Sequence, residues 1–157
     1  MALSMDFSKL DARDVLDVAI HSEVETRDRY EEFATTLARG GHADAAKFFH
    51  GMAKVEIHHA DILRERRAQV CGDVPVRLRD NAFWGIEAPD WEREIAALTV
   101  RDALTTALEA EIRAYDFYAG ALEWVSEPRV TDLLEELRAA ELEHQRFIRL
   151  ELDKIAS

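Results

Sequence analysis

Apolar residues recur along most of this chain at the three- and four-residue spacing of amphipathic helices. The pattern predicts four long helices, at about residues 11–39, 42–70, 100–125 and 128–154. Only Gly40 and Gly41 separate the first two helices, so these two must pack as antiparallel neighbours. Gly51 and Gly120 fall inside predicted helices, where each costs about 1 kcal/mol. A close approach between helices would explain both glycines.

Residues 71–99 interrupt the helical period and lie between the two helix pairs. Prolines and glycines break any regular pattern there, while Trp84 and Trp91 make the segment too apolar for a free linker. We expect a packed crossover, with a short helix around Asp90 to Leu98. The expected fold is therefore all-α: one domain over residues 1–157, with two antiparallel helix pairs joined by a long crossover.

The two halves of the sequence repeat each other. The first helix of each half carries the same residue types at the same offsets: Ala19, Glu23, Asp28 and Tyr30, then Ala107, Glu111, Asp116 and Tyr118. The second helix of each half carries a Glu-x-x-His motif, Glu56 to His59 and Glu141 to His144. Residues three apart on a helix are neighbours, so each motif offers one oxygen and one nitrogen donor to the same point.

The repeated glutamates lie on the apolar stripes of their helices. Four carboxylates facing a protein core would cost many kcal/mol unless they were neutralised. Two divalent cations would balance four glutamates and two neutral imidazoles. The sequence therefore predicts a dinuclear metal site whose ligands are Glu23, Glu56, His59, Glu111, Glu141 and His144, with the four glutamates as catalytic residues.

With these motifs the sequence resembles the rubrerythrin-like proteins of the ferritin-like di-iron carboxylate superfamily. The stretch from Glu23 to Tyr30 (EVETRDRY) is particularly similar to the first helix of rubrerythrins. The resemblance implies a ferritin-like four-helix bundle, a homodimer and two iron ions, with manganese or adventitious zinc as alternatives. It also implies ligand roles: Glu23 and Glu111 terminal, Glu56 and Glu141 bridging, and His59 and His144 each completing one metal.

Several other positions match or depart from the pattern of the rubrerythrins and their relatives. Tyr30 and Tyr118 lie two turns beyond their glutamates, which leaves core packing and hydrogen bonding to the ligands both open. Ala114 stands where rubrerythrins carry an extra carboxylate, which puts fast peroxidase activity in doubt. Ile57 stands where bacterioferritins carry a haem-ligating Met, so no haem is expected. The 13 residues after His144 leave little room for the additional helix of cage ferritins.

Three functions fit these features. The leading expectation is an oxidoreductase that reduces hydrogen peroxide or dioxygen. The chain has one cysteine, Cys71, and so lacks the Cys-x-x-Cys pairs of a rubredoxin module; electrons would come from a separate donor protein. The alternative is a non-catalytic protein that binds or buffers iron. A di-iron oxygenase acting on an organic substrate ranks lower, although the small Ala114 could open a pocket for one.

The composition limits the classes of molecule that this chain is expected to bind. A net charge of −12 disfavours nucleic acid and anionic membranes, because both are polyanions. No segment approaches the roughly 18 apolar residues of a membrane span, and the N-terminal residues lack the apolar core of a signal peptide. We therefore expect a cytoplasmic protein.

Overall fold

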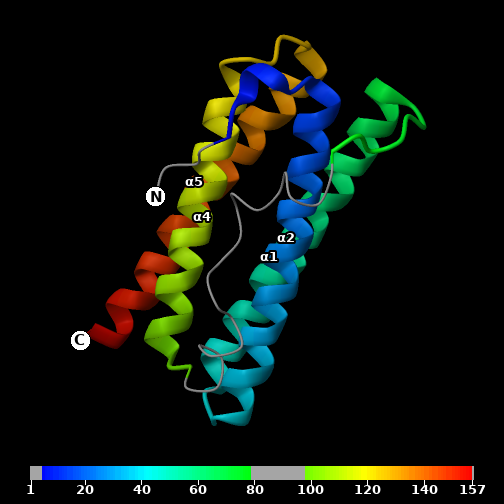
Figure 1. Ribbon diagram of the computed structural model, residues 1–157. Coiled ribbons are helices and arrows are strands. Elements are labelled where there is room, and N and C mark those ends of the chain that lie inside the picture. The colour runs from blue at the N-terminus through cyan, green and yellow to red at the C-terminus, as the bar shows by residue number, and fades with distance from the viewer. Residues whose placement is uncertain (1–4, 79–97, 157) are drawn as a thin grey trace.

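The fold is known from a computed structural model that describes residues 5–78 and 98–156. Within these residues a short 3₁₀ helix, η1 (Phe7–Lys9), precedes four long α-helices. The long helices are α1 (Ala12–Arg39), α2 (Ala43–Cys71), α4 (Val100–Leu122) and α5 (Pro128–Ala156). Helix α1 packs closely along α2, and α4 packs along α5 (Figure 1). The chain is a ferritin-like four-helix bundle, which confirms the predicted fold class.

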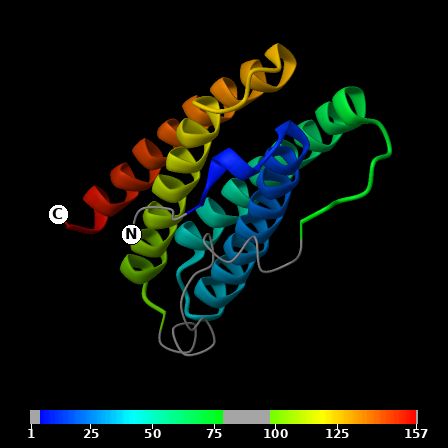
Figure 2. The ribbon, with the colours of Figure 1, turned by 45° about the horizontal axis from the view of Figure 1, so that its top comes forward.

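The directions of the helices explain why a long crossover is needed. In Figure 1, α1 and α5 run down the bundle, whereas α2 and α4 run up it. Helix α2 therefore ends at the opposite end of the bundle from the start of α4, as Figure 2 also shows. The connection between them must cover that length. The expected helix around Asp90 to Leu98 falls, apart from Leu98, outside the described residues, as do Trp84 and Trp91.

Capping residues set the starts of two helices where the sequence predicted them. The Asp14 main-chain N–H donates to the Asp11 carboxylate at 2.9 Å, and the Asp11 N–H donates to the Asp14 carboxylate at 3.1 Å. Thr99 and Asp102 form the same reciprocal capping box at the start of α4. Both pairs satisfy N–H groups that would otherwise have no partner in the first helical turn.

Helix α4 ends earlier than expected, at Leu122 instead of about residue 125. The main-chain N–H of Glu123 donates to the carbonyl of Gly120, and that of Trp124 donates to the carbonyl of Ala121. These bonds span three residues, so they tighten the last turn and close the helix there.

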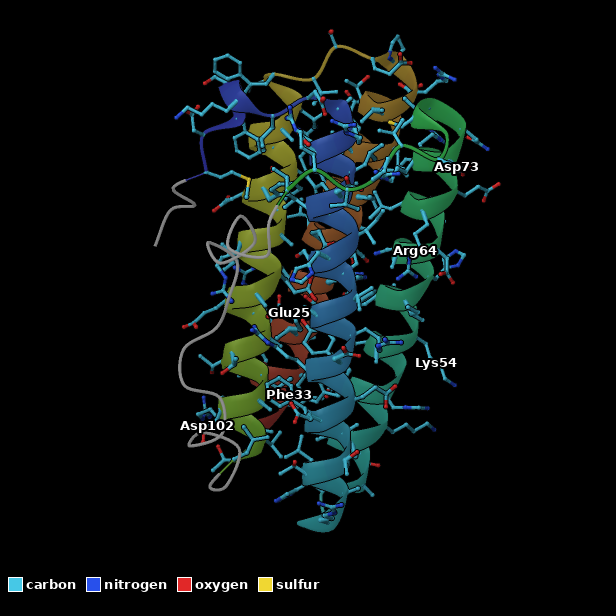
Figure 3. All side chains as sticks on the ribbon, turned by 45° about the vertical axis from the view of Figure 1, so that its right-hand side comes forward. Glu25, Phe33, Lys54, Arg64, Asp73 and Asp102 are labelled. Atoms are coloured by element: carbon cyan, nitrogen blue, oxygen red, sulfur yellow. The ribbon has the colours of Figure 1, made fainter. Side chains whose placement is uncertain are left out.

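Two apolar clusters fill the bundle, one toward each end. Leu16, Phe117 and Leu134 belong to one cluster, and Phe33 and Phe49 belong to the other. All five side chains are almost completely buried, and Figure 3 shows Phe33 on α1 inside the bundle. The middle turns of all four helices lie between these clusters. Within the described part of the chain, no helix is both long and apolar enough to cross a bilayer.

Only one of the two helical glycines marks a close approach, and its neighbour is the short η1 rather than another long helix. A Cβ atom added at Gly120 would lie 2.7 Å from Cε2 of Phe7, a side chain of η1. A Cβ atom added at Gly51 would meet no atom of residues 5–78 or 98–156 within 4 Å. Gly120 thus makes room for an aromatic ring that also packs on Phe117, at 5.7 Å between ring centroids.

Candidate metal centre

Six ionisable side chains lie buried midway along the bundle, between the two apolar clusters. They are the six residues that the sequence analysis singled out: Glu23 from α1, Glu56 and His59 from α2, Glu111 from α4, and Glu141 and His144 from α5. The glutamates are 1–3% exposed. Their neighbours on the same helical stripes are core residues, so packing of the apolar stripes turns all six side chains inward.

His144 lies at the centre of a compact group of donors. Its Nδ1 atom is 3.2 Å from Oε1 of Glu56, 3.3 Å from Oε2 of Glu111 and 3.5 Å from Oε2 of Glu141. The contact with Glu111 has hydrogen-bond geometry. The imidazole ring also stacks on that of His59, with 5.6 Å between the centroids and 12° between the planes. Three helices thus meet at this ring.

His59 has a looser set of neighbours. Its Nδ1 atom is 3.6 Å from Oε2 of Glu23 and 3.9 Å from Oε2 of Glu56. The ligand atoms nevertheless form two groups of four residues, each group lying within 4.8 Å: Glu23, Glu56, His59 and Glu141, and Glu56, Glu111, Glu141 and His144. Because Glu56 and Glu141 belong to both groups, they lie between the other donors.

Two tyrosines connect the halves of the centre. The Tyr30 hydroxyl on α1 donates to Oε1 of Glu111 on α4 at 2.5 Å, and the Tyr118 hydroxyl on α4 donates to Oε1 of Glu23 on α1 at 2.5 Å. Burial and the nearby carboxylates raise the pKa of both tyrosines well above the ordinary value. Both hydroxyls therefore stay protonated and hold the glutamate of the opposite helix pair. The structure shows both roles left open by the sequence, because the rings belong to the two apolar clusters and the hydroxyls bond to the glutamates.

The four glutamates form two pairs whose pKa values shift in opposite directions. Burial raises the pKa of Glu56 and Glu141 well above the ordinary value, and the charges of Glu111 and Glu23 raise it further. Burial acts in the same direction on Glu23 and Glu111, but their interactions with Glu56 and Glu141 and with the neighbouring histidines outweigh it. The pKa of Glu23 falls to about 2, and that of Glu111 falls below its usual range. Without cations, the two central carboxyls are driven toward the protonated form.

The donor set fits a pair of metal ions. Within the described part of the chain, several buried ligand-type atoms of this centre have no hydrogen-bond partner: Oε2 of Glu23, Oε1 of Glu56, Nδ1 of His59 and both carboxylate oxygens of Glu141. A buried polar atom without a partner costs about 1–3 kcal/mol. Divalent cations would satisfy these atoms, and mixed carboxylate and imidazole donors suit iron or manganese.

One buried polar residue beside the centre was missed in the sequence. Gln145 donates from Nε2 to the main-chain carbonyl of Glu111 at 3.5 Å, and its Oε1 accepts a hydrogen bond from Arg149 at 3.3 Å. The matching position in the first half, next to His59, is Ala60. This difference between two otherwise similar halves was the signal that could have identified Gln145.

Comparisons with known proteins agree with this arrangement. The rubrerythrin family model matches residues 14–152. The crystal structure of an uncharacterized conserved protein from Magnetospirillum magnetotacticum MS-1 is similar, with a TM-score of 0.77 and 27% identity over 90% of this chain and 93% of that chain. Curated proteins gave no match. Because the family match spans all four helices and the whole buried centre, the chain belongs to the rubrerythrin family.

Proposed function

We propose that this chain is a di-iron oxidoreductase that reduces hydrogen peroxide or dioxygen. Its family is a di-iron family, and the buried glutamates and histidines could bind metal. The observation that carries the proposal is the pair of four-residue donor groups, which share Glu56 and Glu141. A shared pair of carboxylates between two groups of donors is what a dinuclear centre requires.

The six residues take complementary roles in this proposal. Glu23 and Glu111 would each be a ligand of one ion. Glu56 and Glu141 would be shared between the two ions. His59 and His144 would each complete one site. Bound iron would supply one electron from each of two ions, the number needed to reduce peroxide. The donor set equally admits manganese, and zinc as an adventitious occupant.

The other groups of the protein prepare the site. Tyr30 and Tyr118 each fix one oxygen of an outer carboxylate, so the remaining oxygen is aimed inward. The raised pKa values of Glu56 and Glu141 favour the protonated carboxyls in the metal-free protein, so binding of a cation would release protons. The apolar clusters above and below restrict the access of water to the buried centre.

A separate protein would supply the electrons, because Cys71 is the sole cysteine of the sequence. Non-catalytic iron binding is the second candidate function. Ala114 favours it, because this half-buried residue stands one helical turn after Glu111 at the position where rubrerythrins carry a further carboxylate. A homodimer remains part of the proposal by family resemblance.

Turnover with a defined reductant tests the proposal. The iron-loaded protein should consume hydrogen peroxide or dioxygen over many cycles, and Glu141→Gln should abolish this because it removes a shared ligand. The matched control is Glu143→Gln, which alters an exposed glutamate of the same helix that pairs with Arg146. Turnover that survives Glu141→Gln would refute the proposed site. Stable iron binding without turnover would support the buffering function instead.

A further inference from the structure

We propose that the two halves of this centre bind metal unequally. The half around His144 holds its ion tightly and fills first, whereas the half around His59 holds a weaker, exchangeable ion. The inference rests on the proposed dinuclear function and adds an order of binding to it. The sequence repeat alone would predict two equivalent sites, so the inequality has to come from residues that break the repeat.

The distances between donors differ between the halves. Two ligand atoms bound about 2.1 Å from one ion, at the angles of octahedral or tetrahedral sites, lie about 3.0–3.4 Å apart. The three carboxylate contacts of His144 Nδ1 span 3.2–3.5 Å and fall close to this range. The two contacts of His59 Nδ1 are 3.6 and 3.9 Å and fall outside it. The donors around His144 thus need less movement to receive an ion.

The orientation of the two imidazoles also differs. His144 is held by its hydrogen bond with Glu111, whereas Nδ1 of His59 is buried and has no hydrogen-bond partner among the described residues. The side chain of His59 is 11% exposed, against 6% for His144. A ligand that is already oriented loses less conformational freedom on binding, and a more exposed one exchanges more readily with solvent. Both differences favour tighter binding at His144.

Gln145 is the residue that breaks the repeat beside the ligands. It links α5 to the main chain of Glu111 on α4, and Arg149 one turn later holds its side-chain oxygen. Ala60 occupies the matching position on α2 and has no side-chain polar group to make such a link. We assign Gln145 as a positioning residue that keeps the ligand-bearing turns of α4 and α5 in register.

An anaerobic titration of the full chain with Co(II) tests the order of binding, with visible absorbance and calorimetry as readouts. The expected isotherm has two steps, with the first ion bound at least about tenfold more tightly. His59→Ala should retain the tight step and lose the weak one, whereas His144→Ala should lose the tight step. Two equal steps, or a tight step that survives His144→Ala, would overturn the inference. A wild-type chain that binds one ion or none would instead refute the dinuclear site itself.

Gln145→Ala isolates the positioning role without removing a ligand. Loss of a group that orients metal ligands typically weakens binding about 10- to 100-fold, and we expect the lower end of this range in the first step only. Gln69→Ala, at an exposed glutamine of α2, is the matched control. A first step unchanged by Gln145→Ala, or both steps weakened equally, would contradict the assignment. Thermal denaturation of each variant verifies that it is folded.

Discussion

In the metal-free protein, replacement of Glu56 by glutamine should change how stability depends on pH. Glu56 and Glu141 have pKa values raised above those of the unfolded chain. Each carboxyl therefore keeps a proton in the fold that the unfolded chain releases. Its stabilising contribution is complete below the unfolded pKa of about 4.3 and is lost as the pH rises toward the folded pKa. The wild-type chain should become less stable as the pH increases.

The size of this effect follows from proton linkage. A proton that the folded chain binds and the unfolded chain does not lowers the free energy of unfolding by about 1.4 kcal/mol for each unit rise in pH. The carboxyls of Glu56 and Glu141 together therefore lower it by about 2.7 kcal/mol per pH unit. Glu23 and Glu111 have lowered pKa values, so above pH 5 they are ionised in both states and add nothing. Glu56→Gln removes one titrating group and should leave about 1.4 kcal/mol per pH unit.

Thermal denaturation of the chelator-treated protein between pH 5 and 6 measures this difference. For a domain of this size 1 kcal/mol corresponds to about 2–4 °C in Tm, so wild type should lose roughly 5–11 °C over the interval. Glu56→Gln should lose about half as much, and the exposed control Glu136→Gln should behave as wild type. A wild-type Tm that stays constant or rises, or an unchanged slope in Glu56→Gln, would refute the electrostatic description of the centre.

Two further predictions concern the packing and the hydrogen bonds of the bundle. Gly51→Ala should stabilise the protein by about 0.5–1 kcal/mol, because its methyl group meets open space and Ala favours helix. Gly120→Ala should instead cost about 1 kcal/mol, because Phe7 must move; an equal gain in Tm for both variants would contradict this. Tyr118→Phe should lower the stability of the metal-free protein by roughly 1.5–3 kcal/mol in denaturant unfolding, because Glu23 loses a buried donor; an unchanged midpoint would argue against that bond.

The helices and the six buried residues could be predicted because their signals are local. Apolar periodicity, the capping pairs and the Glu-x-x-His spacing each lie within a few turns of one helix. Helices α1 and α4 follow the capping residues Asp11 and Thr99, close to the starts predicted at about residues 11 and 100. The sequence repeat supplied the long-range information, because two similar halves that pack together bring the ligand-bearing faces of their helices into contact.

Relations between helices could not be predicted from the same signals. The sequence placed Tyr30 on the ligand stripe, but only the packing of α1 against α4 shows that it reaches Glu111. Asp14 belongs to the local cap of α1, yet it is fully buried and also paired with Arg77, 63 residues away. Arg67 likewise pairs with Asp17, 50 residues away. Such contacts depend on the relative positions of whole helices.

The central claim is that this buried centre holds two metal ions per chain. Anaerobic titration with Fe(II) to saturation, followed by Mössbauer spectroscopy of the loaded protein, measures it most directly. We expect saturation at two irons per chain and, after oxidation, the spectrum of a magnetically coupled pair. Glu56→Gln should lose that coupling because Glu56 is shared by both donor groups. Saturation below two irons, or two uncoupled irons in the wild-type chain, would contradict the account.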